Sequence, residues 1–121
     1  MIQDGFMLVD KPEGWTSFKT DRFVGGLLGT RKVGHLGTLD PFATGLLILL
    51  SGKMTKKSSE FLKLDKEYVA TLKLGYTATT GDLEGESQPC SAPKCPQLGM
   101  VESVVQGFVG KISQTPPKYS A

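Results

Sequence analysis

The chain has 121 residues, of which 39% are hydrophobic, and a formal net charge of +2 at pH 7. These totals exclude a disordered chain and predict one compact domain with a modest core. The longest apolar run, residues 46–50, is far shorter than the roughly 20 residues that cross a bilayer. The first ten residues lack the basic and apolar regions of an export signal, so we expect a soluble, cytoplasmic protein.

Charged side chains are unevenly distributed along the chain. The basic clusters are Arg31-Lys32 and Lys53, Lys56, Lys57 and Lys63, and the acidic cluster is Asp82, Glu84 and Glu86. Local basic patches can hold phosphates, but an ordinary solvated surface is the more frequent explanation of such clusters. Charge alone therefore does not predict a nucleic-acid partner.

The cysteine content argues against a metal site. Cys90 and Cys95 are the only cysteines, and only His35 could join them, whereas structural zinc requires four ligands. We expect no metal, and in a cytosolic chain we expect two free thiols rather than a disulfide.

The first half of the chain contains clear element signals. Residues 5–10 (GFMLVD) predict a buried strand, and residues 18–28 have apolar side chains at helical spacing. Thr16 or Ser17 can cap that helix, and Gly29 can end it. Residues 34–45 (GHLGTLDPFATG) predict a loop, because glycine and proline interrupt both periods.

Further elements follow that loop. The continuous apolar run at residues 46–50 predicts a strand covered on both faces. The pattern then predicts a short helix at 53–63, an alternating strand at 67–74, an exposed loop or hairpin at 76–86, a helix with its apolar face between 101 and 109, and a strand before Pro116-Pro117. This order favours an α+β fold with a mixed, largely antiparallel sheet and flanking helices.

The loop carries the residues of chemical interest. An Asp-Pro pair such as Asp40-Pro41 commonly starts a turn, so a structural role is the first interpretation of the carboxylate. The small residues around it, however, would allow a substrate to approach closely, and the following buried strand would hold the loop rigid. His35 is equally open to two interpretations, a ring hydrogen-bonded to the loop or a functional group.

Two common site patterns are absent. No serine lies in a G-x-S-x-G nucleophile elbow, and Gly52-Lys53 lacks the rest of a phosphate-binding P-loop. The loop therefore matches neither a serine hydrolase nor a nucleotide-binding site of that type.

The stretch GHLGTLDPFATGLL resembles the TruB family of tRNA pseudouridine synthases, specifically the bacterial tRNA pseudouridine-55 type. The blocks GFMLVDKPEGWTS, LSGKMTKK, DKEYVATLKLG and KYSA lie in the family's order, so the resemblance covers nearly the whole chain. It implies the N-terminal portion of a pseudouridine synthase catalytic domain at residues 1–121. The other catalytic elements and any C-terminal RNA-binding domain would lie outside this sequence.

The resemblance also implies an activity, the conversion of uridine to pseudouridine in the tRNA T loop. Asp40 would attack the uracil or the ribose of a flipped uridine, with no cofactor or metal. It implies that Tyr68 stacks on the flipped base and that His35 fills the space left in the RNA. Tyr68 would otherwise be an inward-facing strand aromatic.

Other residues take weaker roles from the same resemblance. Lys11 would support the RNA-binding site, Tyr119 would lie near the pocket, and Thr79, Thr80 and Asp82 would lie in a loop that contacts RNA. The family's arginine partner of the catalytic aspartate does not match Arg22 or Arg31. We therefore expect this chain alone to be poorly active or inactive.

The partner expected is the T arm of tRNA, with a monomeric protein. Two alternatives stay open, a non-catalytic module that binds and remodels tRNA and a guide-RNA-dependent relative with a similar GTLDP block. The continuation Phe42-Ala43-Thr44-Gly45 favours the stand-alone bacterial type.

Overall fold

A computed structural model describes residues 4–82, 84–90 and 96–115. The chain divides into two units, residues 1–68 and residues 69–121, which are described separately. Helices and antiparallel sheets occur together, which confirms the predicted α+β class. Among the described helices, none has both the length and the apolar character needed to cross a membrane.

The first unit is built on a three-stranded antiparallel sheet. Its strands are β1 (Gly5–Lys11), β2 (Val33–Leu36) and β3 (Gly45–Ser51), and β3 lies in the centre of the order β1-β3-β2. The strands at 5–10 and 46–50 are thus confirmed. In the register, Met7 of β1 and His35 of β2 both lie opposite Leu49, so these three residues share one face.

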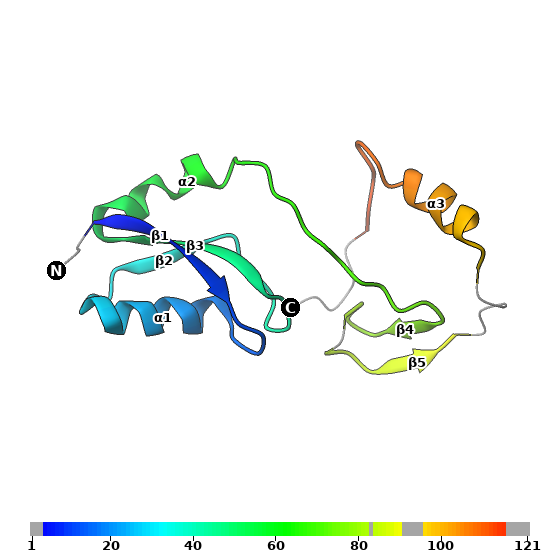
Figure 1. Cartoon of the computed structure of the whole chain (residues 1–121), viewed down its shortest axis with the longest axis horizontal. Coiled ribbons are helices and arrows are strands. Elements are labelled where there is room, and N and C mark those ends of the chain that lie inside the picture. The colour runs from blue at the N-terminus through cyan, green and yellow to red at the C-terminus, as the bar shows by residue number, and fades with distance from the viewer. Residues whose placement is uncertain (1–3, 83, 91–95, 116–121) are drawn as a thin grey trace. The chain divides into compact units, whose positions relative to one another are not determined.

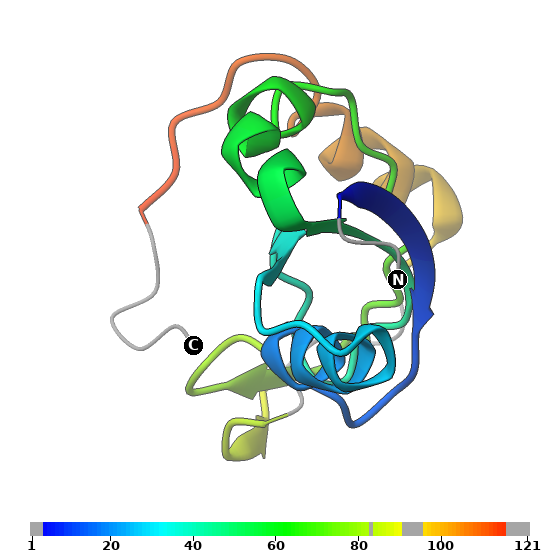
Figure 2. The ribbon, with the colours of Figure 1, turned by 90° about the vertical axis from the view of Figure 1, so that its left-hand side faces the viewer.

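Helix α1 (Ser17–Leu28) lies on one side of this sheet, whereas α2 (Ser58–Phe61) lies on the other (Figures 1 and 2). The Thr16 side chain accepts a hydrogen bond from the Lys19 N–H, and Gly29 ends α1 with a left-handed φ of 66°. The predicted helix with its two ends is therefore confirmed. Its buried side carries four small or polar residues, Ser17, Thr20, Asp21 and Gly25.

The opposite face of the sheet is covered at one end only. After β3 the chain forms a 3₁₀ helix η1 (Gly52–Lys57) and then α2, whose Phe61 ring centroid lies 6.4 Å from that of Phe6. The core of the unit is Leu47, Leu49 and Leu50, whereas Leu46 is 63% exposed. The expectation of a β3 covered on both faces therefore holds only toward the end of the strand, at Leu50, and is wrong for its start.

The second unit contains a hairpin and a helix. Strands β4 (Tyr76–Ala78) and β5 (Ser87–Pro89) pair antiparallel. Of the loop or hairpin expected at residues 76–86, the hairpin is therefore the form observed. Helix α3 (Leu98–Gln106) begins three residues earlier than its first predicted apolar position, Val101, and ends before Phe108. No strand occurs at residues 107–115, so the strand expected before Pro116-Pro117 is absent from the described part of that segment.

Two other predictions of secondary structure were wrong. Residues 67–74 form no strand, because no described segment pairs with their backbone, and side-chain alternation cannot reveal whether a partner exists. Residues 34–36 belong to β2 rather than to the loop. Gly34 does not break the strand there, since it pairs opposite Leu50 within a regular antiparallel register. The segment at 53–63 is helical only in part, as η1 and the short α2.

Candidate active site

The Asp40 loop, residues 37–44, connects β2 to β3 and thus forms the turn of a hairpin. Gly37 begins the loop with a φ of 76°, a left-handed conformation that favours glycine. Asp40 is exposed, and its carbonyl accepts a hydrogen bond from the Ala43 N–H at 3.0 Å. The loop therefore turns through its own backbone and leaves the carboxylate in solvent.

Ser17 holds the loop on the N-terminal side of Asp40. Its buried hydroxyl donates to the Leu39 carbonyl at 3.1 Å and accepts from the Leu39 N–H at 2.9 Å. One side chain at the start of α1 thus satisfies both backbone groups of the residue next to Asp40. Such paired bonds fix the position of the loop relative to the helix.

Lys11 holds the loop on the other side of Asp40. The residue is fully buried, and its Nζ donates to the carbonyls of Pro12 at 3.1 Å, Trp15 at 2.6 Å and Pro41 at 3.3 Å. The Gly14 N–H also donates to the Pro41 carbonyl, at 2.7 Å. All three ammonium hydrogens have acceptors, which allows a charged group to be buried. Lys11 therefore supports the loop from beneath rather than from its solvent side.

His35 lies on β2, just before the loop, and its ring is held at both nitrogens. Nδ1 lies 2.6 Å from Oδ2 of Asp21 on α1, and Nε2 lies 3.2 Å from Oγ1 of Thr38. The His35 side chain is 19% exposed and that of Asp21 is 8% exposed. The partners of the ring are therefore side chains, not the loop backbone that the structural interpretation of His35 assumed.

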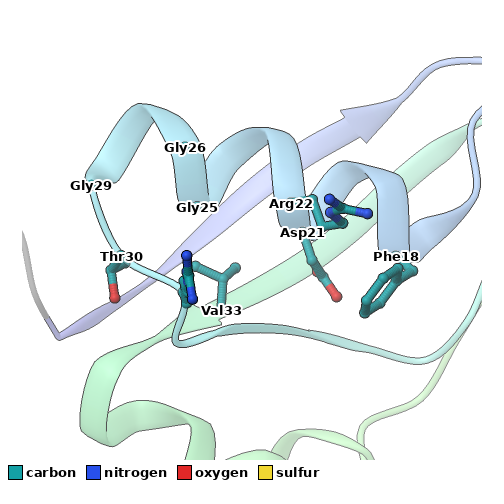
Figure 3. A pocket seen from close by; sticks show the side chains of 9 residues that line it. Phe18, Asp21, Arg22, Gly25, Gly26, Gly29, Thr30 and Val33 are labelled. Atoms are coloured by element: carbon teal, nitrogen blue, oxygen red, sulfur yellow. The ribbon is translucent and has the colours of Figure 1, made fainter.

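A pocket of about 610 Å³ lies beside α1 (Figure 3). It is bounded by one side of the helix, including Phe18, Asp21 and Gly25, by Gly29 just after the helix, and by Val33 where β2 begins. Figure 3 shows Asp21 projecting from α1 on the side of Val33. Because Asp40 does not line this pocket, the pocket alone does not locate the candidate chemistry.

The other predicted site residues lie outside the sheet and helix that hold the Asp40 loop. Tyr68 is 69% exposed in chain without regular structure at the end of the first unit. Thr80 and Asp82 lie between β4 and β5 in the second unit, and Tyr119 lies outside the described residues. The roles that the resemblance implied for these four residues therefore stay predictions.

Thr80 and Asp82 form a turn of their own. The Thr80 hydroxyl donates to Asp82 Oδ1 at 2.6 Å, and the Glu84 N–H donates to the same oxygen at 2.9 Å. These hydrogen bonds, that of Thr80 first, hold the pKa of Asp82 below its ordinary value because they favour the ionised carboxylate. Thr79 joins the same hairpin through its hydroxyl, which accepts from the Glu86 N–H at 3.2 Å.

No three potential ligands among His, Cys, Asp and Glu come together for a metal within residues 4–82, 84–90 and 96–115. Cys90 is exposed, and Cys95 falls outside those ranges, so the expected thiol state stays a prediction.

Sequence reasoning missed two residues that position the site. The sequence presents Ser17 as a possible helix cap and as a serine without a nucleophile elbow, and no motif singles out Asp21. The spacing of Ser17, Asp21 and Gly25 at intervals of four residues could have identified them as one side of α1. Two small residues and a carboxylate on an expected buried side indicate close packing and an internal partner for the carboxylate.

Residues 26–121 match the family model described as TruB family pseudouridylate synthase (N terminal domain). The chain belongs to the TruB family. It is 46% identical over 99% of its length to a tRNA pseudouridine synthase B of Chlamydia pneumoniae, and 44% identical over its whole length to one of Leifsonia xyli. It covers 51% of the first relative and 41% of the second. The chain thus spans about half the length of the curated TruB relatives it matches.

Proposed function

We propose that this TruB family chain carries the nucleophile of an enzyme that isomerises uridine to pseudouridine in the T loop of tRNA, at position 55. The observation that carries the proposal is the setting of Asp40, an exposed carboxylate on a loop fixed on both sides by buried side chains. A nucleophile needs both access to its substrate and a fixed position.

The proposed reaction follows from the chemistry of a carboxylate. Asp40 attacks the uracil ring or the ribose, and the bond between the ribose and uracil N1 breaks. The ring turns and rejoins the ribose through C5, after which the carboxylate is released, a proton leaves C5 and N1 gains one. No electron or group passes to a second substrate, so the proposal includes no cofactor and no metal.

Access to the uridine requires that it leave the stacked T loop. Tyr68, a residue that is 69% exposed, would stack on the extruded base. His35 would occupy the space left in the RNA, and Thr80 and Asp82 would contact the RNA from the second unit. Tyr119 would lie near the base. Lys11 would support RNA binding indirectly, because it holds the Asp40 loop in position.

The domain assignment is part of the proposal. Since the relatives are about twice as long, residues 1–121 would be the N-terminal portion of the catalytic domain, with the remaining catalytic elements and any RNA-binding domain outside them. A cation that pairs with Asp40 would come from those elements, because no ion pair to Asp40 exists within the described residues. Such an enzyme would act as a cytoplasmic monomer.

The test is Asp40→Asn in a protein that contains this chain and the segments found in its relatives. Pseudouridine in T-arm RNA should fall below detection, whereas RNA affinity should stay near that of the unmodified protein. Asp65→Asn, at another exposed aspartate, is the matched control and should leave both unchanged. An equal loss of binding and turnover in Asp40→Asn would assign Asp40 a structural role.

Two further measurements separate the alternatives. Activity that requires an added guide RNA would favour the guide-dependent class. Turnover by the 121-residue chain alone should be far below that of the longer protein, and equal turnover would refute the proposed domain assignment.

A further inference from the structure

Asp21 is a buried carboxylate whose described hydrogen bond goes to a proposed RNA-contacting residue. It is 6% exposed, and its Oδ2 lies 2.6 Å from Nδ1 of His35. Its other oxygen, Oδ1, is buried and has no partner in the described part of the chain. Burying a carboxylate is costly unless a hydrogen-bond donor compensates for the lost water. The His35 ring supplies that donor to Asp21.

The contact determines which ring nitrogen carries hydrogen. An ionised carboxylate only accepts, so the hydrogen between Asp21 and His35 belongs to Nδ1. On the neutral ring, Nε2 then has no hydrogen and accepts from the Thr38 hydroxyl, 3.2 Å away. The ring edge at the start of the Asp40 loop is therefore an acceptor.

The same side of α1 controls two parts of the candidate site. Ser17 binds the backbone beside Asp40, and Asp21, one turn further along, binds His35. One helix thus fixes the positions of both the Asp40 loop and the His35 ring. A side chain held in this way loses little conformational entropy when it binds a partner.

We propose that Asp21 is a positioning residue that fixes the orientation and the tautomer of His35 for contact with RNA. The inference rests on the proposed function, because it takes from it the contact between His35 and RNA. It adds the chemistry of that contact: Nε2, turned away from Asp21, accepts from a ribose 2′-hydroxyl or a base N–H once RNA displaces Thr38.

Nitrogen-15 NMR of the histidine ring tests the inference without RNA. His35 is the only histidine of the 121 residues, and a His35→Gln variant verifies the signal. The neutral ring should carry its hydrogen on Nδ1. A hydrogen on Nε2 would overturn the proposal, and this result requires no substitution of Asp21.

Variants separate positioning from general stability. In Asp21→Ala the hydrogen should move to Nε2, whereas in Thr38→Val, the matched control that removes the other ring partner, it should stay on Nδ1. If Asp21→Ala fails to give a folded amide spectrum, Asp21→Leu, which is similar in shape and has no acceptor, should show a reduced Nδ1–H fraction. An unchanged tautomer in a folded Asp21 variant would contradict the assignment.

RNA binding separates this inference from the proposed function. Asp21→Ala should weaken T-arm RNA binding roughly 2- to 10-fold, the cost of fixing one mobile side chain, and should lose no more than His35→Ala loses. Native affinity in Asp21→Ala together with reduced affinity in His35→Ala would refute the positioning role. Native affinity in His35→Ala would refute the proposed RNA contact of His35, whatever the tautomer.

Discussion

The hydroxyl of Ser17 binds both the N–H and the carbonyl of Leu39, at 2.9 Å and 3.1 Å, across 22 residues of sequence. It joins the first turn of α1 to the residue before the proposed nucleophile. Replacing Ser17 should therefore affect both the stability of the first unit and the position of Asp40.

Ser17→Ala should lower the free energy of unfolding by about 1–3 kcal/mol, because both backbone groups of Leu39 lose a partner in a buried site. Turnover should fall by more than RNA affinity, since the loop would still be present but less fixed. Ser59→Ala, on an exposed position of α2, is the control and should change neither quantity. Urea denaturation and single-turnover kinetics provide the measurements, and native values for Ser17→Ala would mean that the Ser17 hydroxyl does not hold the Asp40 loop.

Lys11→Met should destabilise the chain by about 2 kcal/mol or more, because the carbonyls of Pro12, Trp15 and Pro41 lose a charged donor. Lys53→Met is the matched control: its side chain is 87% exposed, and its Nζ lies 4.0 Å from Asp4, so the change should stay below about 0.5 kcal/mol. Chemical denaturation compares the two variants. Equal effects would mean that the buried ammonium of Lys11 contributes no more than a surface charge.

The two adjacent glycines of α1 should respond to alanine with opposite signs. A Cβ at Gly25 would lie 2.7 Å from the Thr30 carbonyl oxygen, whereas at Gly26 it would meet nothing within 4 Å. Gly26→Ala should stabilise the chain by about 0.5–1 kcal/mol through helix propensity. Gly25→Ala should destabilise it by about 1–3 kcal/mol through overpacking. Thermal unfolding of the pair is the measurement, and a more stable Gly25→Ala would refute this packing.

Thr80→Val should raise the pKa of Asp82 toward its ordinary value of about 3.9, because the strongest hydrogen bond to the ionised carboxylate is lost. Since the folded pKa is depressed, the turn's contribution to stability is present above the unfolded pKa and disappears as the pH falls through the folded value. Carboxyl carbon-13 shifts between about pH 2 and 6 measure the pKa directly. Thr77→Val, on exposed β4, should leave the titration unchanged.

The sequence predicted correctly those helices and strands that are specified by neighbouring residues, such as a capping residue or a short apolar run. Thr16 and Gly29 identified the ends of α1, and the apolar runs identified β1 and β3. The alternating side chains at residues 67–74 predicted a strand that does not form. A strand also needs a partner strand, and the periodicity of one segment does not show whether a partner exists. The sequence drew attention to Asp40 and His35, but not to Ser17 and Asp21. Their partners lie 22 and 14 residues away, a pairing that only the packed sheet and helix create.

The register between β2 and β3 limits how the Asp40 loop can vary in length. His35 lies opposite Leu49, and successive side chains of a strand point to opposite faces. If one residue were deleted from the loop and β2 shifted by one position to compensate, His35 would turn to the face opposite Asp21. Hairpin turns usually tolerate changes in length, but here such a change would break the hydrogen bond between His35 and Asp21.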